Sequence, residues 1–215
     1  MILIPVKNLS TAKQRLASLL DQPMRTELAQ AMLLDVLHAV DNCSAEHVGV
    51  VTTDPYATRL AKEFNFETVV DNNVSETAAI ELATQVCESR GIKSTLVIPG
   101  DIPLITSQEL DQILKAAPRE GSVLVPAADG RGTNAIFRRP AGLFPLRFGN
   151  DSFKPHLAAA RAADKPCIVL SLPGIALDID TPLDLQELSE ASGDTHAQRL
   201  IRKWNLADLA AASNQ

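Results

Sequence analysis

The chain has 215 residues and an ordinary globular composition, with 46% hydrophobic and 21% charged residues. Its formal net charge of −6 argues against nonspecific binding of nucleic acids or anionic membranes, although a nucleotide needs only a locally positive pocket. The sequence has no run of about 20 apolar residues, no signal-peptide pattern at its start and no paired cysteine motif, so we expect a cytoplasmic protein with free thiols.

Short apolar runs alternate with helical patterns along the chain. The predicted strands are Ile2–Val6, His47–Thr53, Glu67–Val70, Thr95–Ile98, Val123–Pro126, Asn134–Phe137, Cys167–Leu170 and Ala176–Ile179. The predicted helices are Arg25–Val40, Tyr56–Glu63, Glu76–Ser89, Ser107–Ala116, Phe153–Ala163 and Pro182–Ala191. Several strands are continuous runs of Val and Ile, as buried parallel strands are. The alternation therefore predicts an α/β fold with a Rossmann-like, doubly wound, mostly parallel sheet flanked by helices.

No linker or internal repeat divides the chain, so we expect one domain over residues 1–215. The final stretch, 192–215, carries Trp204 among several leucines and ends in polar residues. It predicts a C-terminal helix and a polar tail. Because this helix could pack on its own domain or on a second subunit, a homodimer is left open.

Three cations follow the first predicted strand within nine residues: Lys7, Lys13 and Arg15. At the carboxyl end of that strand they could attract a triphosphate, although a solvated helix face would also explain them. Neither a P-loop motif nor a G-x-G-x-x-G after a strand is present, which argues against both of those nucleotide sites.

Three aspartates stand at the ends of two predicted strands. Asp101 follows the strand Thr95–Ile98, and Asp178 and Asp180 close the run Ala176–Ile179. Ligands of open α/β sheets bind outside the carboxyl ends of the strands, where carboxylates can hold Mg²⁺ together with substrate phosphates. The D-x-D spacing would place both late aspartates on one side of a strand. These residues therefore predict a magnesium site suited to phosphoryl or nucleotidyl transfer.

Part of this pattern also has a structural explanation. Thr181 is a good N-cap for the next helix, with Pro182 at its first position and Asp184 in its first turn. Isolated aspartates at such positions are common turn residues.

Two further loops contain residues that suit an anion. In D-G-R-G-T-N-A at 129–135, two glycines around an arginine allow close approach, although a hairpin turn explains them equally well. In F-G-N-D-S-F at 148–153, Ser152 is a plausible N-cap of a helix whose free amides favour a phosphate. A simple capping turn is the alternative, and we expect His156 in the following helix to be structural.

Together these segments resemble the CofC/FbiD family of guanylyltransferases. The matching motifs, in the family's order, are I-P-V-K at 4–7, A-K-Q-R-L at 12–16, G-D-I-P-L at 100–104, G-T-N-A at 132–135, F-G-N-D-S-F at 148–153 and L-D-I-D-T-P at 177–182. The resemblance spans about residues 2 to 188. The order of the motifs is specific, whereas no single motif is.

The resemblance implies a MobA-like nucleotidyltransferase fold. It implies transfer of GMP from GTP to phosphoenolpyruvate, 3-phosphoglycerate or 2-phospholactate, with release of pyrophosphate. The product would pass to a downstream ligase in the biosynthesis of coenzyme F-420. By resemblance, Asp101, Asp178 and Asp180 would hold Mg²⁺, Thr133, Gly149 and Ser152 would hold the acid, and Lys7, Lys13 and Arg15 would lie near the GTP phosphates.

The chain departs from the family at one stretch and leaves rival functions open. Many members carry G-L-N-x-A before the third helix, near the base, where this chain has N-V-S-E-T-A-A at 73–79. The rivals are another nucleotidyltransferase of the same fold, a GT-A sugar transferase and a nonenzymatic nucleotide sensor. The first rival is disfavoured because the chain lacks a G-x-G-x-R opening, and the second because D-x-D comes late in the chain. A sensor is disfavoured because it would not need to retain all three aspartates.

Overall fold

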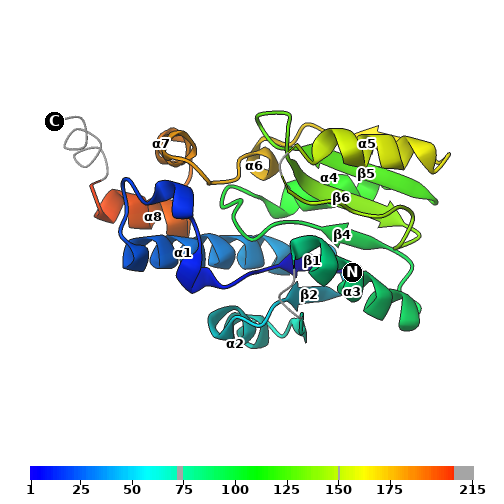
Figure 1. Cartoon of the computed structure of the whole chain (residues 1–215), viewed down its shortest axis with the longest axis horizontal. Helices are drawn as coiled ribbons and strands as arrows, with labels where there is room; N and C mark the ends of the chain where they lie inside the picture. Colours follow the sequence, from blue (N-terminus) through cyan, green and yellow to red (C-terminus); the bar gives the residue numbers. More distant parts are fainter. Residues whose placement is uncertain (72–74, 150, 206–215) are drawn as a thin grey trace.

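One seven-stranded sheet forms the centre of the computed structural model (Figure 1). The structure describes residues 1–71, 75–149 and 151–205. In spatial order the strands are β3 (Glu67–Val69), β2 (Val48–Val51), β1 (Ile2–Pro5), β4 (Thr95–Val97), β6 (Thr133–Arg139), β5 (Gly121–Pro126) and β7 (Cys167–Val169). Among these strands only β6 runs antiparallel to its neighbours, β4 and β5. The predicted mostly parallel sheet is therefore confirmed.

Helices cover both faces of this sheet. The core on one face contains α1 (Gln22–Asp41), α2 (Pro55–Glu63), α4 (Ser107–Ala116), α7 (Pro182–Glu190) and α8 (His196–Lys203), and the core on the other contains α3 (Glu76–Ser89) and α5 (Phe153–Ala162). Side chains of each strand alternate between the two cores, as the twofold period requires. In β1, for example, Ile2 and Ile4 belong to the first core and Leu3 to the second. The doubly wound arrangement is confirmed.

The order of the strands reverses next to β1. From β1 the chain proceeds outward to β2 and β3, and β4 then lies on the opposite side of β1. The loops that leave β1 and β4 therefore diverge, and such a switch point is where open α/β sheets bind ligands. Because β6 is antiparallel to β4, its first residue, Thr133, lies at this same edge. Three segments far apart in sequence are thus brought to one place.

The predicted strand Ala176–Ile179 is wrong. Its first residue ends a short helix, α6 (Pro173–Ala176), and the chain continues from Leu177 outside the sheet. One backbone hydrogen bond, from the Ile179 amide to the Asp101 carbonyl at 3.1 Å, ties this segment to the end of β4. The D-x-D aspartates therefore reach the carboxyl edge on a connecting segment, and the strand-based argument for their common orientation does not apply.

The last described helix packs against the first. The carboxylate of Asp35 in α1 accepts hydrogen bonds from the backbone amides of His196 and Ala197 at 2.7 and 2.9 Å, which satisfies the start of α8. Residues 206–215, with the expected polar tail, lie outside the described residues, as do 72–74 and 150. Within the described ranges, no helix combines the length and apolar character needed to cross a membrane.

Candidate active site

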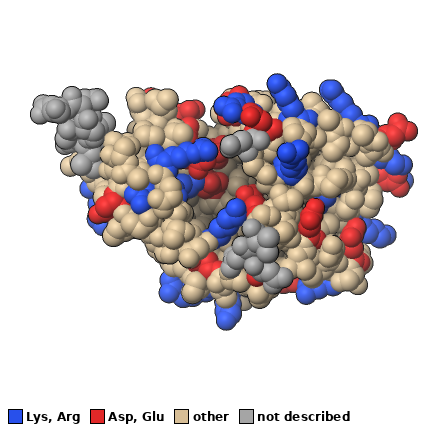
Figure 2. Space-filling model, in the orientation of Figure 1, with Lys and Arg blue, Asp and Glu red and all other residues tan. Residues whose placement is uncertain are grey.

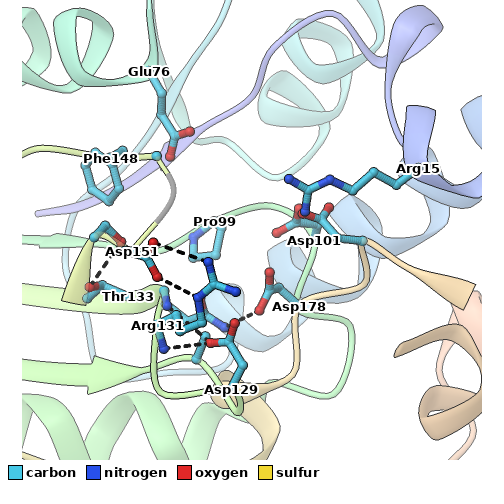
Figure 3. A pocket seen from close by; sticks show the side chains of 16 residues that line it. Arg15, Glu76, Pro99, Asp101, Asp129, Arg131, Thr133, Phe148, Asp151 and Asp178 are labelled. Carbon is cyan, nitrogen blue, oxygen red and sulfur yellow. Dashed lines mark hydrogen bonds and ion pairs between the residues drawn. The ribbon is translucent and has the colours of Figure 1, made fainter. Parts of the chain in front are cut away.

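A pocket of about 420 Å³ opens at the switch point of the sheet (Figures 2 and 3). Its lining includes seven of the nine predicted site residues, namely Arg15, Asp101, Thr133, Gly149, Ser152, Asp178 and Asp180. The two others are Lys13, which bonds to two of these aspartates, and Lys7, whose side chain is exposed outside the lining. We call Asp101, Asp178, Asp180, Lys13 and Arg15 the carboxylate side of the pocket, and Thr133, Ser152 and His156 the hydroxyl side.

The loop after β1 places its cations by local backbone structure. It forms two short 3-10 helices, Leu9–Thr11 and Gln14–Leu16, and the residue between them, Lys13, has left-handed backbone angles of φ 56° and ψ 41°. Buried leucines anchor both turns, and the amide of Leu9 donates to the Asp54 carboxylate at 3.0 Å. Because left-handed angles are uncommon outside glycine and asparagine, this conformation is one that the surrounding contacts must hold.

Lys13 lies between two of the predicted metal ligands. Its ammonium is 2.6 Å from Asp101 Oδ2 and 2.9 Å from Asp180 Oδ1, and its side chain is only 6% exposed. Burial alone would lower the pKa of Lys13, but Asp101 and Asp180 outweigh it and the pKa is raised. Burial likewise opposes ionisation of Asp180, yet Lys13 and Arg15 hold its pKa below the usual value. This part of the carboxylate side is therefore charged and already paired.

Asp178 has a different environment from its neighbours. Among the described residues its carboxylate forms no ion pair, and it accepts a hydrogen bond at 3.0 Å from Asn134 Nδ2, which also donates to the carbonyls of Ile175 and Ala176. Burial raises the pKa of Asp178, and the charges of Asp101 and Asp180 raise it further against the effect of Asn134. The amide therefore fixes the orientation of a carboxylate whose charge is not neutralised.

The carboxylate side fits a divalent cation by its chemistry, although it is not a closed cage. Carboxylate oxygens are the ligands that Mg²⁺ takes in proteins, usually together with substrate phosphates. Within the described ranges, however, no cluster of three or more His, Cys, Asp or Glu side chains is close enough to hold a metal by itself. Lys13 occupies the position between Asp101 and Asp180 that a cation would share. Magnesium binding by these aspartates remains a proposal, taken up below.

The backbone around Asp180 is set by the start of α7. Thr181 is the N-cap and forms a capping box with Asp184, whose carboxylate accepts from the amides of Asp180 at 3.0 Å and Thr181 at 2.7 Å. Pro182 occupies the first helical turn. The structural roles predicted for all three residues of this turn are confirmed, and they fix the position of the neighbouring Asp180.

The hydroxyl side is formed where β6 meets α5. Thr133 and Ser152 are 8% and 4% exposed, and their hydroxyl oxygens are 3.4 Å apart. Ser152 directly precedes α5, but its backbone is helical and its side chain makes no capping bond, so the predicted capping role of this hydroxyl is wrong. The hydroxyl is directed instead toward Thr133 and is left for the pocket.

His156 supports this pair from the interior. Its side chain is 1% exposed, Nδ1 lies 3.0 Å from Thr133 Oγ1, and Nε2 accepts from the Arg147 amide at 2.8 Å. Burial, aided by the positive charge of Arg138, lowers the pKa of His156 to about 4. The imidazole is therefore neutral at physiological pH.

Residues without a predicted role complete the rim. Glu76, at the start of α3, directs its carboxylate into the pocket in Figure 3, and burial raises its pKa, as does Asp101, against the effect of Lys7. Arg131 crosses the opening and pairs with Asp151 at 2.5 Å. Both residues had only a weak signal in the sequence, because Arg131 lies in the glycine-rich loop and Glu76 in the stretch that departs from the family.

Gly149 lies on the same rim as an exposed turn residue. Its φ of 129° belongs to the region that side chains rarely adopt, so the turn itself favours glycine at this position. A Cβ built there would meet no atom of the described residues within 4 Å, apart from its own chain neighbours. The backbone near Gly149 is thus open to a ligand, which is the requirement for the predicted contact.

Comparisons with known proteins show the family of this chain. The model of the family described as guanylyl transferase CofC like matches residues 1–213. A phosphoenolpyruvate guanylyltransferase of Roseiflexus castenholzii is 36% identical over 203 residues, covering 94% of this chain and 93% of that protein. A 3-phospho-D-glycerate guanylyltransferase of Colwellia psychrerythraea is 31% identical over 189 residues, covering 87% and 90%.

Solved structures show the same fold at lower identity. A protein from Desulfovibrio desulfuricans G20, described as a nucleotide-diphospho-sugar transferase, superposes with a TM-score of 0.80 at 20% identity, covering 98% of this chain and 96% of that one. A cytidylyltransferase from Leptospira borgpetersenii gives a TM-score of 0.58 at 15% identity, covering 100% and 96%. These likenesses concern the fold alone, and they confirm the expected nucleotidyltransferase architecture.

Proposed function

The chain belongs to the CofC-like guanylyltransferase family, and on that premise we propose that it transfers GMP from GTP to phosphoenolpyruvate with release of pyrophosphate. The observation that carries the proposal is the pocket at the switch point, where the carboxylate side brings three aspartates together with two cations and the hydroxyl side supplies a buried pair of hydroxyls. A reaction between two phosphorylated anions needs positive charge to offset their mutual repulsion and neutral hydrogen-bond donors to orient them. Relatives that carry the phosphoenolpyruvate name favour this acid as the first to test.

The chemistry requires no nucleophile from the protein. An oxygen of the acid's phosphate attacks the α-phosphorus of GTP and forms a new P–O bond. The bond between the α-phosphorus and the bridging oxygen to the β-phosphate breaks, and pyrophosphate leaves with that electron pair. The attacking phosphate is already ionised, so the contribution of the protein is positioning and electrostatic stabilisation.

The two sides of the pocket would divide this work. Lys13 and Arg15, on the loop after β1, would neutralise negative charge of the triphosphate. Thr133 and Ser152 would hold the phosphorylated acid with neutral donors. Asp101, Asp178 and Asp180 would hold Mg²⁺, which when bound supplies positive charge to the phosphates of the reaction.

The place of the reaction in metabolism is part of the same proposal. The product joins GMP to the acid through a phosphoric anhydride, which is an activated and reactive linkage. By family resemblance it would be consumed by a downstream ligase in the biosynthesis of coenzyme F-420. A homodimer stays a prediction, and light scattering of the purified chain measures it.

Pyrophosphate release tests the proposal directly. The purified chain with Mg²⁺ is given GTP or CTP, each paired with phosphoenolpyruvate, 2-phospholactate or 3-phosphoglycerate, with the downstream ligase and its acceptor present to consume product. We expect release with GTP and phosphoenolpyruvate. Release only with GTP and another of the acids would identify that acid as the substrate. Release only with CTP would favour the cytidylyltransferase alternative. No release from folded protein that binds GTP would reject guanylyl transfer to these acids.

A further inference from the structure

His156 is a buried polar side chain for which the proposed reaction has no role. It lies in the first turns of α5, 1% exposed, with the ring of Phe148 packed edge-on at 5.3 Å. A packing role alone would not require an imidazole in this position. Both ring nitrogens are nevertheless within hydrogen-bond distance of partners, one on the backbone and one in the pocket lining.

The contact with the backbone fixes the tautomer of the ring. The Arg147 nitrogen is a backbone amide and can only donate, so Nε2, at 2.8 Å, must accept and carries no proton. A neutral imidazole then has its proton on Nδ1. The contact between Nδ1 and Thr133 Oγ1 at 3.0 Å is therefore a bond in which His156 donates.

This assignment determines what the two hydroxyls can do. Thr133 Oγ1 accepts from His156 and from Ser152 Oγ at 3.4 Å, so its own proton is directed into the pocket. If Thr133 instead donates to Ser152, the Ser152 proton is the one left for the pocket. In either arrangement one hydroxyl of the pair is free to donate a hydrogen bond into the pocket. A ligand oxygen that accepts it, such as the oxygen of an oxyanion, matches this donor.

We propose that His156 is a positioning residue for the phosphorylated acid, whose Nδ1–H tautomer orients the Thr133–Ser152 hydroxyl pair to donate to a phosphate oxygen. This inference rests on the proposed function, because it assigns the acid to the hydroxyl side. It adds a residue that does not touch the substrate and acts through Thr133. Neutrality of the ring is consistent with its burial and with the positive charge of Arg138 nearby.

Two substitutions separate the two hydrogen bonds of the imidazole. In His156→Asn the amide nitrogen can take the place of Nδ1 and keep the donor to Thr133. In His156→Gln the amide oxygen can take the place of Nε2 and keep the acceptor for the Arg147 amide, while the donor to Thr133 is lost. A merely structural role would make the two variants equivalent or would favour the one that retains the backbone bond.

Steady-state kinetics of the full chain give the main readout. We expect His156→Gln to raise the KM for phosphoenolpyruvate roughly 5- to 10-fold, the effect of one oriented hydrogen bond, with the KM for GTP unchanged. His156→Asn should remain within about 2-fold of wild type. In a Thr133→Val background, His156→Gln should have no further effect on the acid's KM. The exposed His47 provides the matched control, as His47→Gln should change neither constant.

A second measurement does not depend on activity. Two-bond ¹H–¹⁵N NMR correlations of the wild-type protein distinguish the Nδ1–H tautomer from the Nε2–H tautomer at pH 7. The Nδ1–H pattern is expected, and the Nε2–H pattern would overturn the proposal whatever the kinetics show.

The outcomes also separate this inference from the proposed function. If the wild type is active and His156→Gln and His156→Asn raise the acid's KM equally, or not at all, the positioning role is rejected and guanylyl transfer stands. If both variants change the KM for GTP instead, the role is again rejected. If the wild type releases no pyrophosphate with any acid, the proposed function fails and the inference fails with it.

Discussion

The carboxylate side and the hydroxyl side of the pocket are built in opposite ways. On the carboxylate side, three aspartates and two cations meet, and the Asp178 carboxylate, whose pKa is raised by burial, has no ion-pair partner among the described residues. On the hydroxyl side, Thr133, Ser152 and His156 are buried and neutral, and their bonds are directed by a backbone amide. The carboxylate side has charged groups that a bound cation and phosphates could neutralise. The hydroxyl side has its hydrogen bonds already oriented without a ligand.

This difference indicates how one pocket can hold two anions of similar chemistry. The attraction between opposite charges is strong but not directional, and such an interaction suits a triphosphate bound together with a cation. Hydroxyl donors are weaker and directional, which suits a small acid that must be placed for in-line attack.

Removing the unpaired charge should have the largest effect. Asp178→Asn should lower kcat by at least roughly 100-fold, because a carboxylate proposed to hold Mg²⁺ is lost. Its melting temperature should not fall, because repulsion from Asp101 and Asp180 is relieved. The control is Asp164→Asn, an exposed turn residue with φ 50° that asparagine tolerates. Near-normal turnover in Asp178→Asn would remove this residue from the reaction.

The neutrality of the hydroxyl side predicts a dependence of stability on pH. The pKa of His156 is lowered from 6.5 to about 4, so between these pH values the unfolded chain binds a proton that the folded chain does not. The free energy of unfolding therefore does not depend on the titration of His156 above pH 6.5 and decreases as the pH falls toward 4, by up to about 3 kcal/mol. Urea unfolding of wild type and His156→Asn from pH 7 to 4.5 measures it as a difference. Parallel curves would show that His156 titrates normally.

Removing the cation from the carboxylate side should cost stability. Lys13→Met leaves Asp101 unpaired and Asp180 with only the exposed Arg15 as a partner. We expect a loss of about 2 kcal/mol, less than for a fully buried pair, because the two carboxylates are 32% and 40% exposed. Added Mg²⁺ should then raise the melting temperature of the variant more than that of the wild type. Lys165→Met, which breaks an exposed pair with Glu120, serves as control. Equal responses to Mg²⁺ would show that Lys13 and the metal do not share these ligands.

The smallest effect is expected at the exposed cation of the same side. Arg15 is 63% exposed and lies 3.5 Å from Asp180, so Arg15→Gln should change the free energy of unfolding by less than about 0.5 kcal/mol. Its KM for GTP should rise a few-fold while the KM for the acid stays constant, since only the triphosphate would contact this side. The opposite pattern, a change for the acid alone, would reverse the assignment of the two sides.

The two sides also differ in how far the sequence predicted them. Asp101 could be placed because Thr95–Ile98 is a continuous apolar run and parallel strands end at one edge. The run Ala176–Ile179 has the same appearance, but short apolar runs do not distinguish a strand from a segment packed beside one. Lys13 could be expected near the phosphates, but its bond to two aspartates depends on a left-handed residue that no motif indicates.

The hydroxyl side was less accessible to sequence reasoning. The residues themselves indicated only two loops that suit an anion, and the assignment of Thr133 and Ser152 to the acid came from family resemblance. The contact of His156 with Thr133 spans 23 residues and requires β6 and α5 to meet. Ser152 was expected to cap α5, and its helical backbone frees the hydroxyl instead. Local propensity predicts capping, whereas the fold decides where such a hydroxyl points.

The segment that carries Asp178 and Asp180 has a consequence for how this protein could change over time. It runs from α6 to α7 outside the sheet, with Leu177 and Ile179 buried in the core and Asp178 and Asp180 lining the pocket. An inserted residue would displace the two buried side chains, whereas a substitution at either aspartate would change the pocket and leave them in place. Mutation could thus retune or abolish the chemistry of this pocket without selecting against the fold.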